Sequence, residues 1–167
     1  MKKTIYLNSD VCVGCGACVV ACMDQNDIDP AKGQPPFRRY YQIEDESGVQ
    51  YFSMACQHCE DSPCLMACPT GAIARDEITD SVIVQQELCI GCHSCALACP
   101  FGVPRYDAGE KLQKCNLCAE RVGVQLDPAC VRVCPTGALE FGDLNEMLQK
   151  KEAAFAANWL RTGRRIV

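Results

Sequence analysis

The sequence has few aromatic residues and no long apolar segment. Phe, Trp and Tyr make up 7% of its 167 residues, with a single Trp. No run of about eighteen apolar residues occurs, so we expect no membrane-spanning helix. The G-x-G-x-x-G, P-loop and G-x-S-x-G patterns of nucleotide, phosphate and acyl-transfer sites are also missing. The sequence therefore offers no substrate site of its own.

Positive charge is in deficit. The chain has 16 Lys and Arg against 21 Asp and Glu, a net charge of −5. This balance argues against a nucleic-acid partner, because binding to phosphates depends on an excess of Lys and Arg. Residues 1–6 lead into a strand pattern without the apolar region of a signal peptide. We therefore expect a cytoplasmic protein, although a protein exported together with a signal-bearing partner would carry no address of its own.

Cysteine is the residue in excess, with sixteen in the chain. The most regular set lies within residues 89–100, which read C-x2-C-x2-C-x3-C-P. This spacing is typical of bacterial two-cluster ferredoxins, in which the fourth Cys binds a different iron–sulfur cluster from the first three. Three further sets repeat this spacing or widen its middle gap to four or eleven residues, respectively Cys12, Cys15, Cys18 and Cys22; Cys56, Cys59, Cys64 and Cys68; and Cys115, Cys118, Cys130 and Cys134. No cysteine is left over.

Two other uses of sixteen cysteines have to be weighed. A disulfide scaffold needs an oxidising compartment, which no signal peptide indicates. Four structural zinc sites would also use sixteen thiolates. Zinc ribbons, however, pair two C-x2-C turns across a gap, whereas residues 89–99 place four ligands in one run. Iron–sulfur clusters are favoured, and a structural zinc-binding module is the alternative of a different class.

An internal repeat predicts how the motifs combine. Residues 68–73 match residues 134–139 nearly one for one, and similar short strands precede Cys12 and Cys89. We expect residues 73–75 and 82–84 to form a hairpin, and residues 4–7 and 138–141 to pair with each other. The predicted fold class is α+β, with two ferredoxin-like units. The inner unit, residues 56–109, is inserted into an outer unit made of residues 1–22 and 110–141.

Exchange of the fourth ligand within each unit predicts four sites. They are site 1 (Cys12, Cys15, Cys18, Cys134), site 2 (Cys115, Cys118, Cys130, Cys22), site 3 (Cys56, Cys59, Cys64, Cys99) and site 4 (Cys89, Cys92, Cys95, Cys68). With a [4Fe–4S] cluster in each, the charge would fall to roughly −13. Several bases near the ligands either offset this charge or are ordinary surface residues: Arg105, Lys111, Lys114, Arg121 and Arg132.

Two segments contain no cysteine after their first residues. In residues 23–55, a hairpin is predicted from strands 37–43 and 49–52. Its clustered Tyr and Phe residues fit either the core of a sheet, which is favoured, or a lid or docking surface for a cluster. Residues 142–167 predict an amphipathic helix capped by Asp143, which lies against the chain or another subunit. Its apolar stripe is Leu144, Met147, Leu148, Phe155 and Trp159.

Two histidines lie between ligand cysteines. His58 follows Cys56 by two residues, and His93 follows Cys92 directly. Either could tune or bind a cluster. Because four thiolates are already available for each site, we interpret both as plain loop residues.

The motifs resemble those of the four-cluster ferredoxin subunits of molybdenum and tungsten bis-pterin enzymes, the dimethyl sulfoxide reductase and formate dehydrogenase family. The resemblance covers residues 4–141. It rests on the order of the motifs, the gaps after Cys59 and Cys118, and the run Cys-Gln-His-Cys-Glu-Asp-Ser-Pro-Cys at 56–64. It implies four [4Fe–4S] clusters and a large molybdenum- or tungsten-pterin catalytic subunit as partner. The small iron–sulfur subunit of tungsten aldehyde oxidoreductases is also similar.

We therefore expect a non-catalytic electron-transfer subunit. It would connect a catalytic subunit acting on formate, an aldehyde or a similar substrate to a second redox partner, such as a flavin or NAD subunit. A stand-alone polyferredoxin or a hydrogenase-linked ferredoxin subunit is the alternative. Because head-to-tail contacts need not close into a ring, self-association into a longer conductor is a further hypothesis.

Overall fold

A computed structural model describes residues 3–46 and 48–162 and gives an α+β fold of short elements. The helices are α1 (Ala17–Gln25), α2 (Pro63–Met66), α3 (Ser94–Ala98), α4 (Ala119–Gly123), α5 (Ala129–Arg132) and α6 (Leu144–Thr162). The strands form four antiparallel pairs: β1 (Lys3–Leu7) with β8 (Leu139–Asp143), β2 (Arg39–Asp45) with β3 (Gly48–Met54), β4 (Ile73–Arg75) with β5 (Val82–Val84), and β6 (Arg105–Tyr106) with β7 (Leu112–Gln113).

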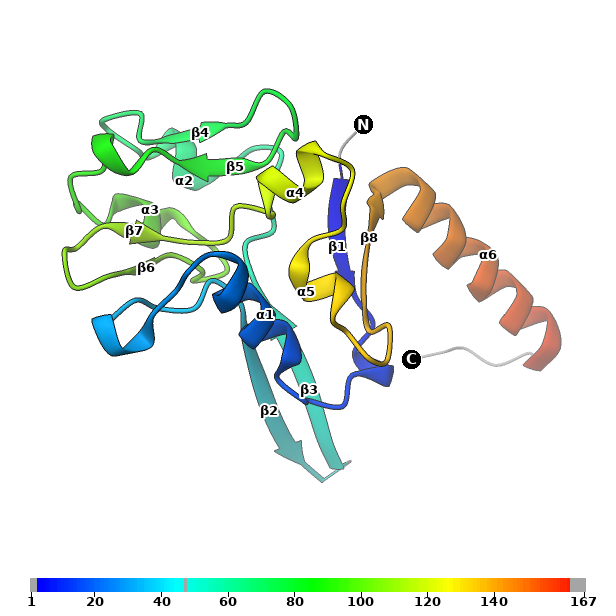
Figure 1. Cartoon of the computed structure of the whole chain (residues 1–167). Coiled ribbons are helices and arrows are strands. Elements are labelled where there is room, and N and C mark those ends of the chain that lie inside the picture. Colours follow the sequence, from blue (N-terminus) through cyan, green and yellow to red (C-terminus); the bar gives the residue numbers. More distant parts are fainter. Residues whose placement is uncertain (1–2, 47, 163–167) are drawn as a thin grey trace.

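The pairing of β1 with β8 brings the two ends of the motif region together. Ile5 lies opposite Phe141, and Leu7 lies opposite Leu139. The expected pairing of residues 4–7 with residues 138–141 is therefore confirmed, with β8 running two residues further. Figure 1 shows the two strands side by side, with α5 close to them.

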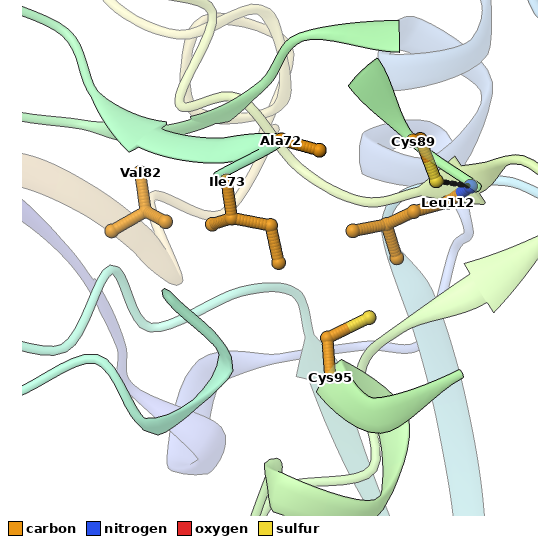
Figure 2. Close-up of a cluster of buried hydrophobic side chains, with 6 residues drawn as sticks. All are labelled: Ala72, Ile73, Val82, Cys89, Cys95 and Leu112. Carbon is orange, nitrogen blue, oxygen red and sulfur yellow. Dashed lines mark hydrogen bonds between the residues drawn. The ribbon is translucent and has the colours of Figure 1, made fainter. Parts of the chain in front are cut away.

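The β4–β5 hairpin forms over the residues that the repeat predicts, 73–75 and 82–84. Its turn is closed by Asp76, whose Oδ1 accepts hydrogen bonds from the backbone N–H of Thr79 at 2.7 Å and of Ile78 at 3.2 Å. Ile73 and Val82 point into a small core, shown in Figure 2, together with Ala72, Leu112, Cys89 and Cys95. Cysteines thus provide part of the only buried apolar cluster found among the described residues.

The β6–β7 pair was not expected from the sequence. Each strand has two residues, too short for an alternating pattern to be visible. The pair nevertheless matters, because it delivers Leu112 to the core beside Cys89. The Leu112 backbone N–H lies 3.5 Å from the Cys89 Sγ.

The short motif helices pack in pairs. Helix α1 of the first motif contacts α5 of the fourth, and α2 of the second motif contacts α3 of the third. Motifs distant in sequence are thereby neighbours in space.

The β2–β3 hairpin extends away from the rest of the chain (Figure 1). The sequence predicts this hairpin, but the interpretation of its aromatic residues as a sheet core is wrong. Tyr40, Tyr41 and Phe52 are 47%, 39% and 44% exposed. A two-stranded sheet has no second layer to cover both faces. Only the face toward the first cysteine motif is packed, through Tyr51 against Gly14 and Tyr40 near Gly16.

Helix α6 begins after Asp143, whose Oδ1 accepts the backbone N–H groups of Asn145 and Glu146. The predicted helix and cap are confirmed. It runs beside β8 and then projects outward (Figure 1). No described residue of α6 is buried, and its Phe155 and Trp159 rings lie 6.0 Å apart at the surface. Across the described ranges, no helix has the length and apolar character needed to cross a bilayer.

Candidate metal centres

The structure brings three of the predicted cysteine sets around cavities. The four cysteines of site 1 line one cavity, those of site 3 a second and those of site 4 a third. In each cavity, one cysteine comes from a motif distant in sequence: Cys134, Cys99 and Cys68, respectively. All sixteen cysteines are free thiols.

The cysteines of site 2 form a fully buried group. Cys22, Cys115, Cys118 and Cys130 are each at most 8% exposed. Burial raises the pKa of the Cys22 thiol, and its three neighbours Cys115, Cys130 and Cys118 raise that pKa further. Burial likewise raises the pKa of Cys115 to about 11. Thiols in such a place become thiolates only with a compensating positive charge, which bound iron supplies.

Tight left-handed turns shape the loops between ligands. Gly14 and Gly16 have φ of +63° and +74°, and Gly91 has +67°. A side chain on Gly14 would overlap the Tyr51 ring, and one on Gly91 would meet the Glu110 carbonyl oxygen at 2.7 Å. Glycine is thus required at both positions by backbone conformation and by close approach.

Within residues 3–46 and 48–162, no three Cys, His, Asp or Glu side chains converge on the position of a single metal ion. A single Zn²⁺ holds each sulfur at about 2.3 Å. The thiols of sites 1, 3 and 4 are spaced around a cavity instead. Four cysteine thiolates around a cavity are the donor set that a [4Fe–4S] cluster takes, so the residues present fit this group.

The β2–β3 hairpin forms one wall of site 1. Tyr40 and Ser53 line its cavity, and the Ser53 Oγ lies 3.3 Å from the Cys18 Sγ. Of the two interpretations of this hairpin, covering a cluster site is the one the structure supports.

Both histidines have more defined roles than plain loop residues. His58 is buried, and its Nδ1 accepts the backbone N–H of Val82 at 2.9 Å. His93 stacks on the Tyr106 ring at 3.7 Å, and its Nε2 lies 2.8 Å from Glu110 Oε2. The Tyr106 hydroxyl in turn lies 3.2 Å from the Cys95 Sγ of site 4. These contacts link the loops but do not make either histidine a ligand.

Of the bases expected near the ligands, only Lys114 is buried, with 5% exposure. Its Nζ lies 3.8 Å from the Cys56 Sγ and donates to the Cys115 carbonyl oxygen at 3.0 Å. Arg121 bonds Asp127 and Gln25 while also lowering the pKa of Cys118, a smaller effect than burial. Three others lie on loops or at the surface: Lys111 bonds the Cys89 carbonyl, Arg105 bonds carbonyls of its own turn, and Arg132 is exposed.

Sequence reasoning missed Arg38, which is only 4% exposed. Its Nη1 donates to the Ser53 Oγ at 3.0 Å, on the side of site 1. It also interacts with Cys115, Cys130 and Cys22 of site 2, lowering the pKa of each thiol against the larger effect of burial and, for Cys22, of neighbouring thiolates. The available signal was a basic residue inside the aromatic run at 37–43.

Exposure differs between the sites. Cys15 of site 1 and Cys92 of site 4 are exposed, whereas all four cysteines of site 2 are buried. Sites 1 and 4 are therefore the ones where a ligand sulfur reaches the surface most openly.

The sequence matches two families described as 4Fe-4S dicluster domain, over residues 47–144 and 11–72. It is 38% identical over 165 residues to an iron–sulfur relative from Escherichia coli K12, a chain of anaerobic dimethyl sulfoxide reductase, covering 91% of this chain and 78% of that protein. Over 168 residues it is 36% identical to the iron–sulfur subunit of the nitrate-inducible formate dehydrogenase of the same organism, covering 90% and 57%.

The thiosulfate reductase electron transfer subunit PhsB of Salmonella typhi is 44% identical over 140 residues, covering 81% of this chain and 72% of PhsB. These similarities agree with the donor sets: sixteen cysteines fit four [4Fe–4S] clusters, as in the related subunits. The chain therefore belongs to the 4Fe-4S dicluster family of iron–sulfur electron-transfer subunits of oxidoreductases.

Proposed function

We propose that this chain carries electrons between a molybdenum- or tungsten-pterin catalytic subunit and a second redox partner, through [4Fe–4S] clusters held at sites 1 to 4. The observation that carries the proposal is the gathering of twelve cysteines around three cavities and of the remaining four in one buried group. Bound there, such clusters accept and release single electrons with little rearrangement.

The polypeptide's part is to hold and space the sites and to exclude water from them. We infer two ferredoxin-like units, an inner one of residues 56–109 within an outer one of residues 1–22 and 110–141. The pairing of β1 with β8 and the packing of α1 on α5 support the outer unit. The β4–β5 hairpin and the packing of α2 on α3 support the inner unit.

Ligand exchange can be tested with three single substitutions in the holoprotein. In the proposed arrangement, Cys99→Ala alters the same electron paramagnetic resonance signal as Cys64→Ala, because both cysteines belong to site 3. Cys92→Ala alters a different signal, from site 4. If Cys99→Ala instead reproduced the spectrum of Cys92→Ala, each motif would bind its own cluster and the exchange would be refuted.

Metal analysis tests the cofactor itself. Anaerobically purified protein should contain about sixteen irons and an equal amount of acid-labile sulfide per chain. Zinc without sulfide would establish the structural zinc module instead.

The catalytic partner is proposed from the related proteins, three of which are named as subunits or chains of dimethyl sulfoxide reductase, formate dehydrogenase and thiosulfate reductase. Affinity purification from the native cells, followed by molybdenum and tungsten analysis, should recover a large pterin-containing subunit. A preparation that contains only this chain would favour a stand-alone polyferredoxin. The mass of the complex measured over a range of concentrations tests head-to-tail self-association, since a fixed mass would exclude it.

We also propose a cytoplasmic location. Sixteen free thiols are kept available for cluster assembly in a reducing compartment. Cell fractionation tests the location, and recovery of the holoprotein outside the cytoplasmic fraction would contradict it.

A further inference from the structure

Two cations of this chain are buried without a carboxylate partner among the described residues. Arg38 and Lys114 are 4% and 5% exposed. In the described ranges the salt bridges join other residues: Lys32 with Asp29, Arg75 with Asp80, and His93 with Glu110. An unpaired charge in the interior costs several kcal/mol. Each of these cations therefore needs an anionic neighbour of another kind.

Cysteine sulfurs of two sites surround Arg38. Toward site 1, the Arg38 Nη1 donates to the Ser53 Oγ at 3.0 Å, which leaves the Ser53 hydroxyl hydrogen free to point at the Cys18 Sγ, 3.3 Å away. Toward site 2, the guanidinium hydrogen bonds Cys130 and interacts with Cys115. Arg38 thus lies between the first and the second site.

Lys114 lies between site 2 and site 3. Its Nζ is 3.8 Å from the Cys56 Sγ of site 3, and it donates to the carbonyl oxygens of Val82 and of Cys115, a ligand of site 2. Carbonyl contacts fix the ammonium group in place, so its charge cannot move out to solvent. Cys56 and Cys115 are also close enough to affect each other electrostatically.

We propose that Arg38 and Lys114 are counter-charges shared by neighbouring sites, Arg38 by sites 1 and 2 and Lys114 by sites 2 and 3. This inference rests on the proposed function, because it assumes clusters at these sites. A fixed cation between two clusters favours an electron on either one and weakens the repulsion between electrons on both. The two residues therefore make the first three sites an electrostatically connected row, with site 2 under the influence of both cations.

The test is a set of reduction potentials measured by redox titration followed by electron paramagnetic resonance on the holoprotein. Arg38→Met should shift the reduction equilibria of sites 1 and 2 more than tenfold toward the oxidised form, a fall of about 59 mV for one electron. Sites 3 and 4 should change less than twofold. Lys114→Met should shift sites 2 and 3 in the same direction and leave sites 1 and 4 unchanged.

Matched variants separate charge from packing. Arg38→Lys keeps the positive charge and should recover most of the shift. Arg132→Met removes an exposed cation two residues from Cys130, and solvent screening should keep its effect below twofold. Ser53→Ala leaves Arg38 in place but removes the hydroxyl at Cys18, so only site 1 should shift. This last variant also tests the inference if Arg38→Met fails to take up iron.

A pattern without pairs would overturn the inference. Equal shifts at all four sites, a shift at one site only in fully loaded Arg38→Met, or an equal effect of Arg132→Met would each do so. These outcomes are distinct from failure of the proposed function, which would appear in the unmodified protein as missing iron and sulfide.

Discussion

Replacement of Gly14 by alanine should destabilise site 1 through one identifiable contact. Gly14 has φ of +63°, and a Cβ at this position would lie 2.2 to 2.7 Å from three atoms of the Tyr51 ring, including Cγ. Because Cγ is close to the backbone, the whole ring has to move. The left-handed conformation costs an alanine about 1–2 kcal/mol. Overpacking against the ring adds about 1–3 kcal/mol.

Gly137 provides the matched control. It lies three residues after Cys134 of the same site, has φ of +66°, and a Cβ there meets nothing within 4 Å. Gly137→Ala therefore carries the backbone cost alone. The expected difference between the two variants is about 1–3 kcal/mol, or about 5- to 150-fold in an equilibrium constant.

The assay is the rate at which the signal of site 1 disappears during anaerobic incubation with an iron chelator. Gly14→Ala should lose this signal faster than Gly137→Ala by up to the factor above, if the ring and the loop have separated before iron leaves. In a Tyr51→Ala background the excess should vanish, because the double mutant removes the contact. Equal rates for the two glycine variants, or an excess that persists without the Tyr51 ring, would refute the reasoning.

Three further outcomes are expected. Tyr106→Phe removes a hydroxyl 3.2 Å from the Cys95 Sγ and should lower the potential of site 4 alone by about 40 mV, about 1 kcal/mol of the 1.5–3 kcal/mol of a charge-assisted bond; redox titration measures it, with the exposed Tyr41→Phe as control. Gly91→Ala, which meets the Glu110 backbone at 2.7 Å, should reduce iron content by about one cluster, an effect absent in Gly71→Ala, where a similar φ meets open space. Complete removal of iron should abolish the near-ultraviolet circular dichroism of the chain, because cysteines replace much of its apolar core; an unchanged spectrum would contradict this.

Repetition in the sequence made much of the fold predictable. The similar segments 68–73 and 134–139 indicated which strands pair, and both the β4–β5 hairpin and the β1–β8 pair formed as expected. The cysteine spacing also grouped the residues of sites 1, 3 and 4, which the structure brings around cavities. In these cases the information is local, because ligand spacing and turn residues lie within each motif.

Features that depend on tertiary contacts could not be predicted in this way. The two residues of β6 carry no strand pattern, and their role appears only when Leu112 meets the core. An arginine in an aromatic run looks like an exposed hairpin residue, yet Arg38 is buried because cysteines from motifs one and four surround it. The exposure of Tyr41 follows from the lack of a covering layer, which no local pattern reveals.

The partnership of β1 with β8 also has a consequence for biosynthesis. Ile5 leaves the ribosome first but has to wait for Phe141, about 7–30 s later at ordinary rates of translation. Residues 56–99, by contrast, can associate while the remainder is still being made. Cofactor insertion should therefore begin in the middle of the polypeptide and finish when its last strand arrives, so a truncated nascent chain ending before residue 139 can be completed only at its centre.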